Sequence, residues 1–426
     1  MEVRLGYKQT EVGVIPVDWL VKPLGELTTL MTNGFVGVAT RHYTQNDSGV
    51  LYIQGYNVEE NAFNFHGIKY VTEAFHRQHM KSCLREGDLL TVQTGDVGLT
   101  TFVPANLVGS NCHALIISRF DRKRVESKFV SLYLNSVPGR ARLKLIETGT
   151  TMKHLNVGDM LHFDIPLPPT MAEQQAIATA LSDADALIES LEQLLAKKRQ
   201  IKQGAMQELL AAKRRLPGFE GERSVKRVGE FTDCTAGGTP STRVPEYWGG
   251  TIRWMSSGEL NLKTVDEVGG RITELGLKNS STKMIPPRCV LIGLAGQGKT
   301  RGTVAMNTVA LCTNQSIAAI FPNELFDPMY LYYSLDSRYD ELRELSAGDG
   351  GRGGLNLTII RSLEIPFPEL PEQTAIATIL SDMDADIATL EAKLAKARAI
   401  KHGMMQELLT GRVRLVSNST SSTGNA

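Results

Sequence analysis

Two long stretches of the chain carry apolar residues at steps of three and four, the pattern of a helix with one apolar stripe. In residues 173–216 the stripe comprises Leu187, Ile188, Leu191, Leu194, Leu195, Ile201, Ala205 and Leu209, and in residues 372–415 it comprises Ile387, Leu390, Leu394, Ala397, Ile400 and Met404. Acidic residues gather in the first turns and basic residues in later ones, which suits the helix dipole. Each stretch predicts a helix of about 40 residues, or about 60 Å at 1.5 Å per residue.

The two helical stretches are copies of one another. Aligned at a fixed offset of 199 without a gap, they share 28 of 44 residues. A narrow apolar stripe of this length requires a partner helix, and the other copy is the obvious one. We therefore predict a helix-pair spacer whose contacts come from Leu187, Leu191, Leu195, Ile201, Ile387, Leu390, Leu394 and Ile400. The alternative, in which each helix lies on its own globular domain, fits the near-identity of the copies less well.

The duplication continues, more weakly, into the segments before the helices. The corresponding pairs are Asp164–Pro168 with Glu364–Pro368, Leu155-Asn156 with Leu355-Asn356, and Val21–Leu27 with Val225–Phe231. The chain is therefore a tandem duplication of a divergent globular module followed by a nearly invariant helix. The predicted boundaries are 1–168 and 217–368 for the modules and 169–216 and 369–415 for the helices. Residues 416–426 lack apolar side chains and are expected to be a disordered tail.

Each module has the pattern of mixed β structure with short helices. Strand-like runs occupy 50–53, 88–92, 114–117, 290–292 and 317–320, and short helices are predicted at 127–136 and 328–345. The fold class is α+β, with two tandem mixed α/β domains that are each followed by a long helix.

Composition narrows the class of protein. Hydrophobic residues make up 42% and charged residues 22%, which is typical of a globular chain. No apolar run approaches the roughly 20 residues of a membrane span, and the start of the sequence has no apolar signal core. Five cysteines without a CxxC spacing suggest reduced thiols in a cytoplasm. Lys plus Arg equals Asp plus Glu at 46 each, so the net charge of the chain gives no indication of a nucleic-acid partner.

Several motifs together resemble one known family. They are GYKQTEVGVIPVDW near the start, RLPGFEGE and VKRVGEF in the middle, GGTPS at 237–241, and the Ile-Pro-x-Pro then EQxAIA entry to each helix. This combination, from Gly6 to about Leu415, is similar to the specificity subunit of type I restriction–modification systems. One departure is Trp19, whose counterpart in the second module is Arg223.

The resemblance implies that each module is a target recognition domain for one half of a split double-stranded DNA site. It implies that the helices form an antiparallel coiled coil that docks two methyltransferase subunits, through which restriction subunits join. The chain would then be a non-catalytic subunit in a bacterial or archaeal cytoplasm, with no membrane association. It would bind no cofactor, whereas its partners would use S-adenosylmethionine, ATP and magnesium.

Residues 293–300 fit the P-loop pattern GxxxxGK[ST]. A phosphate site needs a helix directly after this loop, but Gly302, Thr303 and Val304 are poor residues for a helix start. We therefore predict a polar loop between strands and, on the resemblance, a DNA contact. The DNA-binding candidates in this loop and its counterpart are Gln297, Lys299, Thr300, Arg301, Gln93, Thr94 and Thr100. The polar turns before the two Ile-Pro-x-Pro motifs add Lys153, His154 and Arg352. A plain flexible loop is an equal alternative for these turns.

Two further groups match known kinds of site only in part. His76, His79 and Cys83 have helical spacing but no suitable fourth metal ligand, so a polar helix face is the better interpretation. Asp386 with Glu391 and Lys393 has the spacing of metal-dependent nucleases but lies inside a long helix. The chain is thus expected to carry no metal site and no catalysis of its own. The competing functions are a P-loop ATPase built on 293–300 and a coiled-coil scaffold without a DNA role.

Overall fold

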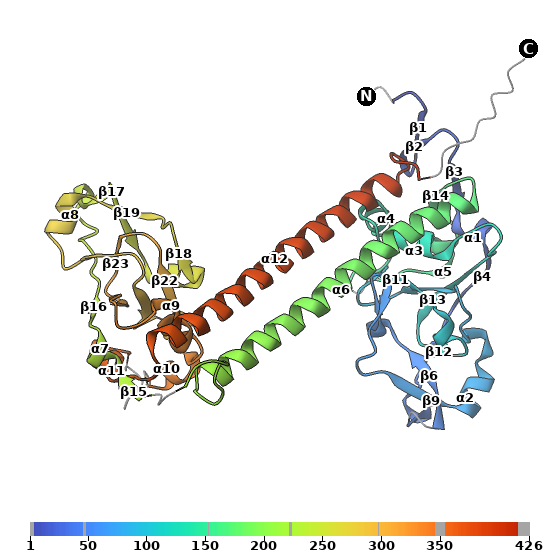
Figure 1. Cartoon of the computed structure of the whole chain (residues 1–426). Helices are drawn as coiled ribbons and strands as arrows, with labels where there is room; N and C mark the ends of the chain where they lie inside the picture. Colours follow the sequence, from blue (N-terminus) through green and yellow to red (C-terminus); the bar gives the residue numbers. More distant parts are fainter. Residues whose placement is uncertain are drawn as a thin grey trace, which may run out of the picture. The chain divides into compact units, whose positions relative to one another are not determined.

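The computed structural model describes residues 4–45, 48–151, 153–220, 224–296, 298–345 and 354–415. The chain divides into two compact units (Figure 1). Unit 1 comprises Met1–Leu191 and Lys393–Ala426, and unit 2 comprises Glu192–Ala392. Each unit therefore contains one globular module, one half of the first long helix and one half of the second. The predicted tail at 416–426 and Arg223 lie outside the described residues.

The module of unit 1 is built on two four-stranded sheets. The first has the order β11 (Thr100–Phe102), β10 (Leu89–Val92), β13 (Leu115–Phe120) and β4 (Thr28–Asn33), with antiparallel neighbours. The second has the order β12 (Asn111–Cys112), β6 (Gly49–Ile53), β9 (Lys69–Thr72) and β5 (Tyr43–Thr44). All four residues of β10, Leu-Leu-Thr-Val, are buried, as is typical of an inner strand that is covered on both faces.

The module of unit 2 repeats the central strands of this topology. Its first sheet has the order β16 (Cys234–Ala236), β24 (Ile317–Ile320), β21 (Val290–Gly293), β22 (Val304–Asn307) and β18 (Thr264–Val265). Its second has the order β19 (Gly270–Ile272), β17 (Trp248–Met255), β23 (Leu311–Thr313) and β20 (Met284–Ile285). In both modules one pair of the second sheet is parallel, β6 with β12 and β17 with β23. The duplication found in the sequence thus extends to the central strands, while unit 2 adds β18 to its first sheet and pairs β20 with β23 where unit 1 pairs β5 with β9.

The Ile-Pro-x-Pro segments form a strand that closes each module. β14 (Asp164–Leu167) pairs with β3 (Leu20–Pro23), and β25 (Glu364–Phe367) pairs with β15 (Ser224–Arg227). Each is a two-stranded sheet, in which edge positions tolerate proline. Ile165 and Ile365 are buried from these strands.

The short helices agree with the sequence prediction. They are α3 (Ser127–Asn135) and α4 (Val137–Leu143) in unit 1, and α9 (Pro328–Asp336) and α10 (Tyr339–Leu345) in unit 2. A further short helix precedes each Ile-Pro-x-Pro strand, α5 (Val157–Leu161) and α11 (Leu357–Ser362). α1 (Leu24–Leu27), α2 (Glu73–Gln78), α7 (Val228–Phe231) and α8 (Glu274–Lys278) complete the set of α-helices in the described residues, apart from the two long ones.

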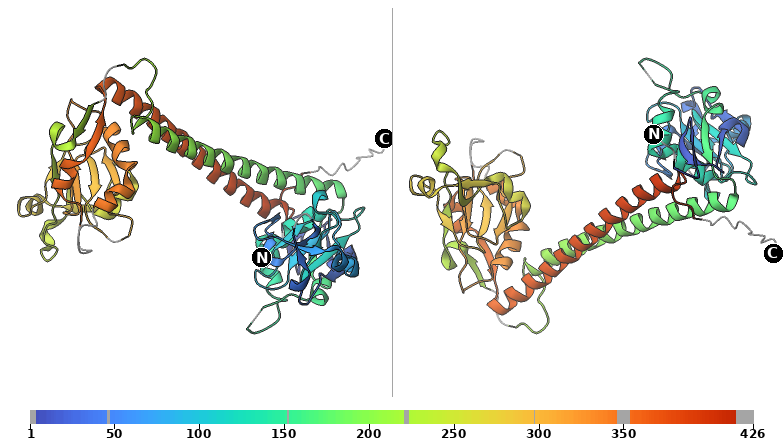
Figure 2. Two further views of the ribbon diagram at one scale, coloured as in Figure 1. Left: turned by 90° about the horizontal axis from the view of Figure 1, so that it is seen from below. Right: turned by 90° about the horizontal axis from the view of Figure 1, so that it is seen from above.

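The two long helices, α6 (Met171–Leu209) and α12 (Leu370–Leu408), have 39 residues each. Both are shorter at their carboxyl ends than the predicted 216 and 415. Ala212 and Gly411 stand at equivalent positions after the two ends, with φ of 58° and 69°, and this left-handed backbone cannot continue an α-helix. Within each unit a half of α6 lies beside a half of α12, as Figure 2 shows from two further directions.

Each unit has its own main core, to which both long helices contribute. In unit 1, Ile177 and Leu181 of α6 and Leu408 of α12 pack with the module, together with the fully buried Trp19. In unit 2 the equivalent set is Ile376, Leu380 and Leu209 with its module. The start of one long helix and the end of the other are therefore both fixed to the same module. No helix among the described ranges combines the length and the apolar character that crossing a bilayer requires.

Candidate nucleic-acid interface

In unit 1 the two predicted polar loops lie side by side. Thr94, after β10, forms a β-bridge with His154, before α5. Gln93 exchanges hydrogen bonds with Leu155: the Leu155 N–H donates to the Gln93 carbonyl and the Gln93 Nε2 donates to the Leu155 carbonyl, both at 3.1 Å. Lys153 and Thr94 are exposed beside this junction. Gln93, Thr94, Lys153 and His154 thus share one surface, although 59 residues separate Thr94 from Lys153 along the chain.

Thr100 is a correction to the predicted interface. Its side chain is fully buried, and its hydroxyl lies 3.0 Å from that of Thr91 and 3.2 Å from the Gly98 carbonyl. Its N–H donates to the Asn135 Oδ1 at 3.1 Å. Since Thr100 already begins β11 within the sheet, it cannot reach DNA, and its role is to join the sheet to α3.

In unit 2 the corresponding loops also meet. The Leu355 N–H donates to the Leu294 carbonyl at 3.0 Å, as Leu155 does to Gln93 in unit 1. Lys299 is exposed, and Thr300 and Arg301 are half-buried. Gln297 and Arg352, two further predicted contacts, lie outside the described residues. After Thr303 the chain enters β22, which runs antiparallel to β21. The helix that a P-loop requires is therefore replaced by a strand, which leaves the ATPase alternative without support.

The helix pair is antiparallel in both units. In unit 2, Lys198 pairs with Asp386 at 2.9 Å and Lys202 with Asp384 at 2.5 Å, so partners descend on α12 as residues ascend on α6. In unit 1, Lys401 pairs with Asp185 at 2.5 Å, the same contact after the offset of 199. Such partly exposed pairs contribute about 0–1 kcal/mol each and therefore specify register more than stability.

The apolar seam is narrower than the sequence stripe. Leu195 and Leu394 are buried, and Leu191, Ile387 and Leu390 are half-buried. The prediction was wrong for three residues of the stripe, which are about half exposed: Leu187, Ile201 and Ile400. Lys198 and Lys202 are only 40% and 18% exposed although both are charged, as expected of long basic side chains that bury their aliphatic stems and keep the charge in solvent.

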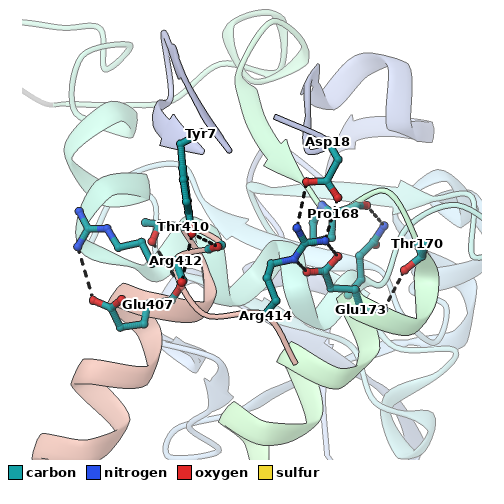
Figure 3. Close-up of polar contacts among 11 residues, drawn as sticks. Tyr7, Asp18, Pro168, Thr170, Glu173, Glu407, Thr410, Arg412 and Arg414 are labelled. Carbon is teal, nitrogen blue, oxygen red and sulfur yellow. Dashed lines mark hydrogen bonds and ion pairs between the residues drawn. The ribbon is translucent and has the colours of Figure 1, made fainter. Parts of the chain in front are cut away.

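A pair of buried carboxylates at the starts of the long helices was missed by sequence reasoning. In unit 1, Arg414 forms ion pairs with Glu173 and with Asp18 at 3.0 Å (Figure 3). In unit 2, the equivalent Arg215 binds Glu372 at 2.8 Å. The Glu173 and Glu372 side chains are 2% and 1% exposed. Hydrogen bonds to Glu173 and Asp18 raise the pKa of the Arg414 guanidinium above its ordinary value. The available signal was that the glutamate and the arginine recur at equivalent positions of the repeat, Glu173 with Glu372 and Arg215 with Arg414.

The remaining motifs have structural partners. The His76 and Asn111 side chains lie 3.1 Å apart, and His79 ends α2 with its Nδ1 2.8 Å from the Phe75 carbonyl. Within the described ranges, no cluster of three or more His, Cys, Asp or Glu side chains has the arrangement of a metal site. Asp386 pairs with Lys198, and Glu391 pairs with Arg199 at 2.5 Å. The nuclease-like spacing therefore consists of contacts between two helices.

Comparisons with known proteins give the same picture. The family described as type I restriction modification DNA specificity domain matches twice, over residues 16–202 and 221–398. The specificity subunit of the type I restriction enzyme EcoR124I/EcoR124II of Escherichia coli is 25% identical over 393 residues, which cover 89% of this chain and 90% of that one. The putative type I restriction enzyme MjaX specificity subunit of Methanocaldococcus jannaschii is 24% identical, with 96% and 97% covered.

A solved structure shares the fold over nearly the whole length. The crystal structure of the type I restriction–modification S subunit from M. genitalium aligns with a TM-score of 0.60 and 15% identity, covering 96% of this chain and 98% of the other. The two family matches fall one on each half of the duplication, each with its module and most of its long helix. The chain therefore belongs to the family of type I restriction–modification specificity subunits.

Proposed function

We propose that this chain is the non-catalytic subunit that gives a type I restriction–modification complex its DNA sequence specificity. Each module reads one half of a bipartite site in double-stranded DNA. The paired helices dock two methyltransferase subunits, and restriction subunits join through them. The chain binds no cofactor of its own, and S-adenosylmethionine, ATP and Mg²⁺ serve the partner subunits.

The observation that carries this proposal is the unequal divergence of the duplicated parts. The two modules keep the order of their central strands but differ in the side chains of their polar loops. The two helices keep 28 of 44 residues and one equivalent ion pair, Lys202 with Asp384 and Lys401 with Asp185. Two readers of different bases need different surfaces, whereas two docking sites for identical partners need the same one.

Selection from a random pool of DNA duplexes tests the proposal. The chain is purified with its methyltransferase subunits, the retained duplexes are sequenced, and the methylated adenines are mapped. We expect two short half-sites separated by a gap of constant length. Failure to retain any duplex in the presence of the partners would favour a scaffold without a DNA role. ATP hydrolysis by the lone chain that disappears in Lys299→Ala would favour an ATPase.

A further inference from the structure

In both modules, a backbone carbonyl of the loop that follows an inner strand of the first sheet accepts a hydrogen bond from an arginine of a short helix. In unit 1, the Arg140 Nη1 of α4 donates to the Val97 carbonyl at 2.8 Å. In unit 2, the Arg343 Nη1 of α10 donates to the Gly298 carbonyl at 2.6 Å. The two loops follow β10 and β21, which are equivalent strands, and the two arginines lie on equivalent helices.

Packing reinforces each arginine contact. Gly98 has φ of 81°, and a Cβ there would lie 2.9 Å from the Arg140 Nη1. Gly302 has φ of 78°, and a Cβ there would lie 3.3 Å from the Arg343 Cγ. In unit 2 the Tyr339 hydroxyl also donates to the Lys299 carbonyl at 3.1 Å. Each loop thus lies closely against its helix, with carbonyls directed inward.

A surface loop does not need this support, since water can satisfy its carbonyls. The two loops also differ in length and content: the connection is 93–99 between β10 and β11 but 294–303 between β21 and β22. What the duplication retains is the support, and what it varies is the exposed polar side chains, Thr94 and Asp96 in unit 1 and Lys299 in unit 2. This combination is expected of an element that must hold different side chains at a fixed place.

We propose that these two supported loops are base-contacting elements of the modules, an inference that rests on the proposed function. Lys299 donates to the O6 or N7 of a guanine in one half-site, because a cation matches two acceptors on that base edge. Asp96 accepts from the exocyclic amino group of a cytosine in the other half-site. A carboxylate is repelled by the phosphates, so at a DNA surface it is useful only opposite a base donor.

Arg140 and Arg343 are positioning residues in this scheme. They touch no base and act through the loop backbone. A side chain that distinguishes bases must be held to within about 0.5 Å, which a loop attains only when other residues support it. Loss of either arginine should therefore reduce base discrimination in its own half-site and leave overall affinity for DNA less affected.

The test uses the full chain with its methyltransferase subunits and the random duplex pool. The variants are Lys299→Ala, Asp96→Ala, Arg343→Ala and Arg343→Lys. We expect Lys299→Ala to reduce selection of one guanine by about tenfold and to leave the other half-site unchanged. Asp96→Ala should do the same for a cytosine in the opposite half-site. Arg343→Ala should relax the positions that Lys299→Ala affects, and Arg343→Lys should restore part of the selectivity.

Arg338→Ala is the matched control, because Arg338 lies just before the same helix but contacts Glu341 and the Glu364 carbonyl, away from the loop. Thermal unfolding of each variant separates loss of folding from loss of selectivity. If Lys299→Ala weakens all sequences equally and lowers the salt dependence, Lys299 contacts phosphate and the inference is wrong. If Arg343→Ala keeps the selectivity of Arg338→Ala, the positioning role is wrong. If the unmodified chain selects no bipartite sequence, the proposed function itself fails.

Discussion

Replacing Arg414 with alanine should destabilise unit 1. Arg414 joins distant parts of this unit, because one of its two partners, Asp18, lies 396 residues away along the chain. The Arg414 guanidinium binds Glu173, whose side chain is 2% exposed, and Asp18, which is 33% exposed. Removing one partner of a fully buried ion pair costs about 3–5 kcal/mol, because the remaining charge stays desolvated. Arg414 is itself 24% exposed, so water can reach part of the site, and we expect a loss of about 2–4 kcal/mol.

The effect should appear first in the amino-terminal hairpin, β1 (Tyr7–Thr10) with β2 (Gly13–Pro16). The Tyr7 hydroxyl donates to the carbonyls of Gly411 and Arg412, each at 3.2 Å, so this hairpin rests on the chain after α12. Hydrogen exchange of the hairpin amides measures its local opening, and urea unfolding measures unit 1.

Arg412→Ala is the control, because Arg412 pairs with Glu407 at 3.5 Å with both side chains well exposed. Such a pair contributes about 0–1 kcal/mol, so little change is expected. Equal hairpin protection in Arg414→Ala and Arg412→Ala would refute the reasoning that the buried carboxylate determines the cost.

Further predictions concern recognition and partners. Exchanging residues 224–364 for the module of a relative should change one half-site and leave the other half-site and the gap unchanged, as methylation mapping would reveal; a change in both would contradict the division into modules. With 46 basic and 46 acidic residues, the lone chain should bind duplex DNA weakly and gain affinity with the methyltransferase subunit, in binding assays at two salt concentrations; nanomolar affinity of the lone chain at physiological salt would contradict this. Arg215→Ala should destabilise unit 2 in urea about as much as Arg414→Ala destabilises unit 1, and an unchanged unfolding midpoint would contradict the equivalence of the two pairs.

Secondary structure could be predicted from the sequence wherever the spacing of apolar residues follows the buried positions of a strand or helix. The strands around 50–53, 88–92 and 317–320 and the short helix at 127–136 appear within a few residues of their expected bounds. The long helices were predicted too long, because the segments after Leu209 and Leu408 remain similar in the two copies although they are not helical. Similarity between copies shows that a structure recurs, but not which structure it is.

The candidate site was harder to predict, because the partner of a polar side chain is a property of three dimensions. Thr94 and His154 were both candidates, yet nothing local indicates that they form a bridge. Thr100 was misassigned because the sequence does not show whether a threonine hydroxyl faces solvent or, as here, Thr91. The arginines behind the loops, Arg140 and Arg343, carry no local signal, since their function depends on carbonyls 43 and 45 residues away.

The last prediction concerns the length of α6. Four residues inserted after Glu192 fall beside the division between the units, so the part of α6 that packs on each module keeps its own sequence, while one half of α6 moves by about one turn along α12. Four residues add about 6 Å of helix and nearly preserve the direction of the apolar stripe, and 6 Å is close to two base pairs.

We expect this variant to keep both half-site sequences and to lengthen only the gap between them, as mapped from methylated adenines. A one-residue insertion at the same place is the control. It rotates the following residues by about 100° and should abolish recognition, because the seam residues then face solvent. If the four-residue variant keeps the original gap, or if it changes the bases that are read, the helices do not set the distance between the half-sites.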